Sequence, residues 1–127
     1  MASPALASID DYAPPHERAP ALDLVHLARQ SLGDRELESE LLQLFTTQTA
    51  HILDRLGDPA VVDPRRRADL AHTLKGSART VGAHAVACAA EAYEYAVVAG
   101  RPTQHEWRAL AKAAREARAA IATLMDE

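Results

Sequence analysis

The sequence predicts an all-α fold, an antiparallel up-down-up-down four-helix bundle with a short extra N-terminal helix. Apolar residues recur at three- and four-residue intervals along four stretches of about 17 to 24 residues, which is the spacing of amphipathic helices. Short segments containing glycine and proline separate the stretches and would end each helix. The 127 residues include one Phe, one Trp and three Tyr, so we expect the core to consist of closely packed aliphatic helices.

The chain is expected to have one domain after a short tail. Segment 1–21 contains four prolines and few large apolar residues, which predicts an extended or disordered tail. Residues 22–127 are expected to form the bundle, because their length suits one modest core. No internal repeat appears, and a second domain would not fit.

Aspartate residues mark the starts of the first two helices. The short helix is expected to follow the N-cap Asp23 and to end at Gly33. Its apolar residues are Leu24, Leu27 and Leu32. The first long helix is expected to follow the N-cap Asp34 and to end at Gly57 and Pro59. Its predicted buried stripe consists of Leu37, Leu41, Leu44, Phe45, Ile52 and Leu56, with Gln48 as the one polar member.

The other three long helices have comparable boundary residues. Asp63 followed by Pro64 predicts the start of the second long helix, which is expected to end near Gly82. The third covers residues 83–99, and residues 103–106 have the sequence of a capping box before the fourth. The predicted buried residues are Leu70, Leu74, Ala78 and Val81 in the second, Val86, Ala90, Tyr93 and Val97 in the third, and Trp107, Leu110, Ala114, Ala117, Ile121 and Leu124 in the fourth.

Charge limits the classes of partner. The formal net charge of −4 argues against general nucleic-acid binding, which favours a basic surface. A local basic cluster is nevertheless expected, and it would suit an acidic site on a partner protein. Its members are Arg65, Arg66, Arg67, Lys75 and Arg79.

Cysteine, histidine and hydropathy patterns exclude several other classes. The single Cys88 cannot form an internal disulfide, and its alanine-rich surroundings predict a buried side chain. The six histidines include no H-x-x-x-H pair, so no metal site is expected. No apolar run reaches the roughly 18 residues of a membrane span, and the N-terminus has no secretory leader pattern. We therefore expect a cytoplasmic protein with no membrane partner.

The candidate functional residues lie on the exposed face of the second long helix. At about 100° per residue, His72 points away from the buried stripe that contains Leu74. Lys75, Gly76 and Arg79 follow His72 by three, four and seven residues and therefore share its face. A glycine inside a helix costs about 1 kcal/mol relative to alanine. Because Gly76 is not on the buried stripe, it is better explained by close approach of a partner to His72.

These residues resemble a known family, the histidine-containing phosphotransfer (HPt) domains of bacterial two-component phosphorelays. The family hallmark is a helix reading roughly H-x-x-K-G-[SA]-[SA]-x-x-x-G. His72, Lys75, Gly76, Ser77, Ala78 and Gly82 match it in order and without a gap. Residues 36–45 also resemble a helix common in the family. The resemblance implies a four-helix bundle whose His72 accepts phosphate from a receiver-domain aspartyl phosphate and passes it to another receiver.

Glu94 is a further candidate. Because two helices joined at Gly82 would run antiparallel, Glu94 is expected near the level of His72. In parts of the HPt family a matching glutamate or glutamine hydrogen-bonds the histidine, which fixes the tautomer and makes the other ring nitrogen more nucleophilic. The alternative is an ordinary solvated glutamate, and Glu91 is a weaker candidate for the same role.

The sequence therefore predicts a phosphocarrier rather than an enzyme. It has no P-loop or other nucleotide-binding motif, so no autokinase activity is expected. The resemblance implies response-regulator receivers and a hybrid histidine kinase as partners, with no cofactor of its own and Mg²⁺ supplied by the receiver. A monomer is expected. Two alternatives remain open: a non-catalytic helical interaction module, and a dimeric histidine phosphotransferase resembling a sensor-kinase dimerisation domain.

Overall fold

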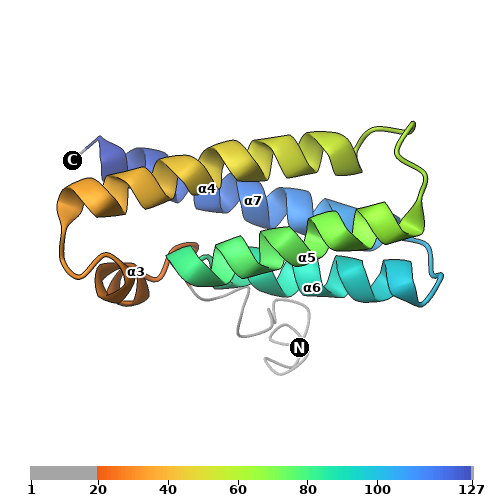
Figure 1. Cartoon of the computed structure of the whole chain (residues 1–127), viewed down its shortest axis with the longest axis horizontal. Helices are drawn as coiled ribbons and strands as arrows, with labels where there is room; N and C mark the ends of the chain where they lie inside the picture. The colour runs from red at the N-terminus through yellow and green to blue at the C-terminus, as the bar shows by residue number, and fades with distance from the viewer. Residues whose placement is uncertain (1–19, 127) are drawn as a thin grey trace, which may run out of the picture.

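Five α-helices make up the part of the chain that the structure, a computed structural model, describes, namely residues 20–126. The short helix α3 (Leu24–Gln30) comes first. The long helices are α4 (Arg35–Leu56), α5 (Pro64–Val81), α6 (His84–Val98) and α7 (Gln104–Met125). They lie side by side, and α3 lies at the end where α4 begins and α5 ends (Figure 1). The predicted all-α class is confirmed for the described residues, whereas the tail prediction falls almost entirely outside them.

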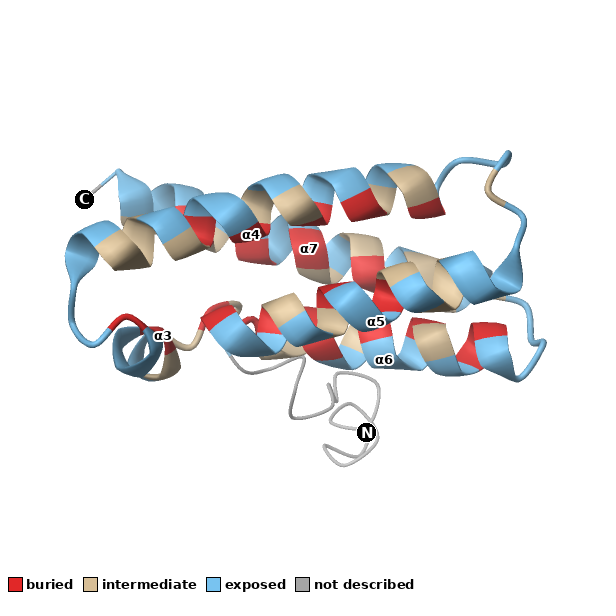
Figure 2. Cartoon of the chain, viewed as in Figure 1, coloured by how far each residue is buried: buried red, intermediate tan, exposed pale blue. Residues whose placement is uncertain are grey.

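The core lies between the four long helices. α5 packs against α6, α6 packs against α7, and α4 packs against both α5 and α7. The buried residues lie on the faces that these helices turn toward one another (Figure 2). Alanine is frequent among them, which allows α5 and α6 to pack closely. The largest fully buried side chains are Tyr93, Leu27, Leu42, Leu74, Leu110, Val86, Thr49 and Ser31.

The helix starts at Asp23, Asp34 and Asp63 agree with the sequence prediction. In each case the carboxylate accepts a hydrogen bond from a backbone N–H of the first turn, which satisfies a donor that has no partner within the helix. The capping box predicted before α7 is wrong. Thr103 makes no side-chain cap; its hydroxyl instead accepts a hydrogen bond from Arg67 Nη2 at 3.4 Å.

Part of the buried stripe predicted for α4 is also wrong. Leu44 is 68% exposed, whereas Leu42 and Thr49 are buried. Leu44 follows Leu42 by two residues, or about 200° around the helix, so the two cannot both face the core. Because α4 packs against both α5 and α7, the stripe centred on Leu42 is the one that faces the core.

Helix α3 is shorter than the sequence suggested. It ends at Gln30, and Leu32 has a positive φ of 55° and is 89% exposed. Leu32 therefore belongs to the turn before α4 rather than to the core. Leu27 is fully buried against the long helices, so α3 shares their core.

The start of α3 is tied to the turn between α5 and α6. The backbone N–H of Asp23 donates to the Gly82 carbonyl at 2.9 Å. The carboxylate of Asp23 accepts from the backbone N–H of His26 and lies 3.0 Å from His84 Nε2. These two hydrogen bonds hold the pKa of the Asp23 carboxyl below its ordinary value. The sequence offered no signal for this link because the paired residues are 61 positions apart.

Cys88 is exposed, contrary to the sequence prediction. Val86 and Ala90 of α6 are buried, and Cys88, two residues from each, lies on the opposite side of the helix. Its free thiol lines a groove of about 390 Å³ between α6 and α7. An alanine-rich neighbourhood in sequence therefore did not place this residue in the core.

Candidate functional site

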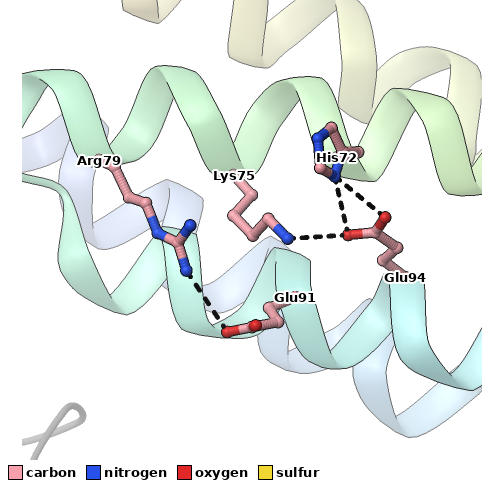
Figure 3. A network of polar contacts seen from close by, with 5 residues as sticks. All are labelled: His72, Lys75, Arg79, Glu91 and Glu94. Carbon is pink, nitrogen blue, oxygen red and sulfur yellow. Dashed lines mark hydrogen bonds and ion pairs between the residues drawn. The ribbon is translucent and has the colours of Figure 1, made fainter.

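His72 lies in the middle of α5 with its side chain 65% exposed. Ala71 and Leu74 on either side are fully buried and fix the rotation of the helix. The imidazole consequently stands on the outer surface of α5, above the neighbouring helix α6 (Figure 3). This is the position that the hydrophobic pattern predicted. A ring held mid-helix is well placed to meet a partner, because its backbone does not fray.

Glu94 of α6 lies against one nitrogen of the His72 ring. Its carboxylate oxygens are 3.1 Å and 3.4 Å from Nδ1, as Figure 3 shows. A carboxylate accepts hydrogen bonds only, so this contact favours the tautomer with the proton on Nδ1. Nε2 then keeps its lone pair. The turn at Gly82 and Ala83 brings these residues together from 22 positions apart.

Lys75 also uses Glu94 as its partner. Its Nζ lies 3.2 Å from Glu94 Oε1, and the Lys75 side chain is 14% exposed. A single carboxylate therefore receives the imidazole N–H and the ammonium at the same time (Figure 3). The helical spacing predicted that Lys75 shares the face of His72, but it did not predict this ion pair. The register that brings Glu94 to His72 also brings Glu94 within reach of Lys75.

Gly76 leaves space beside His72. A Cβ built on Gly76 would meet no heavy atom within 4 Å, so no packing against the protein requires glycine at this position. The residue is exposed and lies one helical turn from His72. The structure thus presents an exposed imidazole beside a stretch of bare backbone.

Arg79 makes a second, weaker pair across the same two helices. Its Nη2 lies 3.7 Å from Glu91 Oε2, and both side chains are 58% exposed. A solvent-exposed pair of this kind contributes little to stability, typically under about 1 kcal/mol. The structure thus pairs Glu91 with Arg79 rather than with His72.

The predicted basic cluster is smaller than the sequence suggested. Arg67 turns inward, donates from Nε to the Tyr93 hydroxyl at 2.9 Å and lies against the Tyr93 ring. Lys75 and Arg79 are paired with glutamates. Arg65 and Arg66 are exposed near the start of α5. The surface around His72 is therefore nearly balanced in charge rather than strongly basic.

The opposite flank of His72, toward α4, has a different character. Ser77 donates its hydroxyl hydrogen bond to the Gln48 side-chain oxygen, which explains the polar residue noted on the apolar stripe of α4. Beside this bond, Leu44, Thr80 and Val81 help to line a shallow groove of about 140 Å³ between α4 and α5. This groove could not be predicted from a sequence pattern in which Leu44 belonged to the core.

A comparison with known protein families identifies the family of the chain. The Hpt domain family model matches residues 40–127, which comprise more than half of the chain. The chain belongs to the Hpt domain family. This match includes α5, α6 and α7 and most of α4, and it leaves α3 outside. No curated protein and no solved structure shows a significant match to the chain.

Membership gives a general function. Hpt domains are phosphocarriers that act in two-component signalling, where they interact with receiver domains and kinases. Among the helices of residues 20–126, none is sufficiently long and apolar to cross a bilayer. In the same residues of this Hpt domain, no three His, Cys, Asp or Glu side chains gather in a way that could hold a metal ion.

Proposed function

We propose that this Hpt domain relays a phosphoryl group between receiver-domain aspartates, with His72 as the phosphoacceptor. The observation that carries the proposal is the division of roles on the imidazole ring. Nδ1 faces the Glu94 carboxylate at 3.1 Å, so Nε2 is the ring nitrogen that can attack phosphorus. The His72 side chain is exposed beside the open surface at Gly76. A nucleophile oriented by a hydrogen-bonded carboxylate is suited to group transfer.

The transfer step balances with residues on the two proteins. The lone pair of His72 Nε2 forms a bond to phosphorus while the bond from phosphorus to the receiver's aspartate oxygen breaks. The electron pair of that bond returns to the aspartate, which leaves as a carboxylate. The proton on Nδ1 stays hydrogen-bonded to Glu94 throughout. The reverse sequence delivers the phosphoryl group to the aspartate of another receiver.

Most of the catalytic power would come from the receiver. Mg²⁺ held by its acidic residues would neutralise the charge that develops on the phosphoryl oxygens. This Hpt domain would need no cofactor of its own and would not phosphorylate itself, since its sequence carries no nucleotide-binding motif. Lys75 and Arg79 lie on the face of His72, and each is paired with a glutamate in the unphosphorylated protein. Carrier therefore describes the proposed role better than enzyme.

The receiver would dock over the α4 flank of His72. On the α6 flank, Glu94 and Glu91 already have partners, whereas the α4 flank offers the exposed Leu44 and the open surface at Gly76. A monomer in the cytoplasm, where receiver domains act, is part of the proposal. So is the up-down-up-down order of the four long helices, which the short connections and the alternating chain direction in Figure 1 support.

The test is to incubate the purified chain with phosphorylated receivers and to measure acid-labile label on histidine. Wild-type protein should be labelled, and His72→Gln should fold normally and accept none, as checked by circular dichroism and label counting. Label on another of the six histidines would overturn the site assignment. If no receiver or small phosphodonor labels the protein, a non-catalytic interaction module is the better description. A dimer of defined stoichiometry in solution would instead favour the sensor-kinase-like alternative.

A further inference from the structure

Lys75 is not free in this structure to hold a phosphoryl group. Its side chain is 14% exposed and its ammonium lies 3.2 Å from Glu94 Oε1, whereas the other carboxylate oxygen of Glu94 faces His72 Nδ1 at 3.1 Å. Figure 3 shows the three side chains joined in a row from Lys75 through Glu94 to His72. Two donors therefore share one acceptor group. A change in the charge of either donor must alter the contact that the other one makes.

The formal charges of His72, Glu94 and Lys75 indicate how phosphorylation would change the contacts among them. With a neutral imidazole, the Glu94 carboxylate is balanced by the Lys75 ammonium. Once Nε2 carries a phosphoryl group while Nδ1 keeps its proton, the ring itself becomes cationic. The ring then balances Glu94 without help, and a dianionic phosphoryl group stands a few ångströms away. Because opposite charges attract most strongly where water is partly excluded, the ammonium now has a stronger partner than the carboxylate.

We propose that Lys75 changes its ion-pair partner when His72 is phosphorylated: its ammonium moves from the Glu94 carboxylate to the phosphoryl oxygens. In the unphosphorylated protein, Glu94 holds this ammonium close to His72. This inference rests on the proposed function and adds a resting state to it. Glu94 acts as a positioning residue for both neighbours: it orients the ring and holds the ammonium that the phosphorylated ring will need.

The position and chemistry of Lys75 suit this exchange better than those of Arg79. Lys75 follows His72 by three residues, about 4.5 Å along the helix axis, whereas Arg79 is about 10.5 Å along it. An ammonium on a flexible four-carbon stem has three donors that can be redirected by rotation, whereas a guanidinium is a rigid planar fork. Arg79 also has a separate partner in Glu91. The exchange therefore requires side-chain rotation at Lys75 and no change of the helices.

The side-chain NMR signal of Lys75 can be followed directly, because Lys75 and Lys112 are the only two lysines in the sequence. Protein labelled with ¹⁵N at the lysine side chains should give two Nζ signals, with Lys112 on the exposed face of α7 as an internal control. Labelling His72 with phosphoramidate, a small donor that needs no receiver, should shift the Lys75 signal and leave the Lys112 signal unchanged. The ³¹P chemical shift of the phosphoryl group should also differ between phosphorylated wild-type protein and phosphorylated Lys75→Met. An unchanged Lys75 signal on fully phosphorylated protein would overturn the proposal.

A second measurement uses Glu94→Gln, which keeps an acceptor for the imidazole N–H but removes the charge that holds Lys75. In unphosphorylated Glu94→Gln, the Lys75 signal should move toward that of a solvated lysine. In phosphorylated protein, Lys75→Met should shorten the phosphohistidine lifetime several-fold. That factor should be the same with Glu94 or with Glu94→Gln, because Lys75 has already left the carboxylate. Lys112→Met should leave the lifetime unchanged.

The outcomes separate this proposal from the proposed function. If phosphoramidate and receivers both fail to label His72, the function itself is wrong and the exchange falls with it. If His72 is labelled and Lys75→Met shortens the lifetime only when Glu94 is intact, the ammonium still acts through the carboxylate and the exchange is wrong while the relay stands. Retained labelling with a Lys75 effect independent of Glu94 supports both.

Discussion

Two glycines, in the middle and at the end of α5, occupy opposite environments. Gly76 is exposed, and a Cβ there would meet nothing within 4 Å. Gly82 is buried with a φ of 82°, and a Cβ there would lie 2.8 Å from the backbone oxygen of Asp23. The fold requires glycine at the end of the helix, where the chain turns and α3 approaches. Glycine in the middle of the helix does not stabilise the fold, so we attribute Gly76 to the close approach of a partner molecule to His72.

The largest effect is expected for Gly82→Ala. Alanine at a left-handed position costs about 1 to 3 kcal/mol, and the contact with the Asp23 backbone would also force the start of α3 to move. We expect a corresponding loss in the free energy of unfolding, measured by urea denaturation. Gly100→Ala is the matched control, because Gly100 has a φ of 70° and open space around it. An equal loss in both variants would mean that the approach of Asp23 contributes nothing.

Gly76→Gln is expected to act on transfer rather than on folding. A long side chain one turn from His72 would stand where the receiver must approach, so the rate of transfer from a phosphorylated receiver should fall by roughly tenfold or more, which corresponds to about 1.4 kcal/mol or more. Labelling by phosphoramidate should be retained, since a small donor needs less room. Receiver transfer at the wild-type rate would contradict the clearance argument.

Gly76→Ala adds only a methyl group at the same position and tests what glycine there costs in stability. Because Cβ meets open space, the substitution should raise the free energy of unfolding by up to about 1 kcal/mol through the lower backbone entropy of the unfolded chain. Urea denaturation measures the gain directly. A loss of stability would show that Gly76 has a structural role that its surroundings do not reveal.

The smallest effect is expected at Asp23, where the pKa is lowered by hydrogen bonds from the His26 backbone and from His84. A carboxyl with a lowered pKa stabilises the folded protein above the unfolded pKa of about 4. That contribution is lost as the pH falls through the folded pKa. The difference in unfolding free energy between wild-type and Asp23→Asn should therefore be present above about pH 4 and shrink as the pH falls below it. A difference that stays constant down to pH 2 would exclude a role for the charge.

How much was predictable from sequence depended on how local the determinant is. Helix caps such as Asp34 and Asp63, and the orientation of His72, depend on residues within one or two turns. The direction in which Leu44 points was missed because α4 carries two overlapping apolar stripes, and tertiary packing decides between them. Cys88 was misplaced because composition does not specify rotation around a helix.

Contacts between helices were likewise predictable only where a short stretch of sequence determines them. The two-residue turn between α5 and α6 allowed Glu94 to be placed near His72 by counting residues. The shared use of Glu94 by Lys75 needed side-chain geometry. The inward turn of Arg67 links α5 to Tyr93 of α6 and to Thr103, the N-cap residue of α7. No local sequence pattern encodes contacts between residues so far apart in the chain.

The short turn at Gly82 also determines how much chain must be ordered to assemble the site. His72 and Glu94 are 22 residues apart, whereas Asp23 and His84 are 61 apart. Because the entropic cost of closing a loop grows as (3/2)RT ln n, the first pairing costs about 0.9 kcal/mol less than the second. Opening of α3 should therefore leave the phosphoacceptor pair assembled. Amide hydrogen exchange would show this as weaker protection in α3 than in α5 and α6, and equal protection would contradict it.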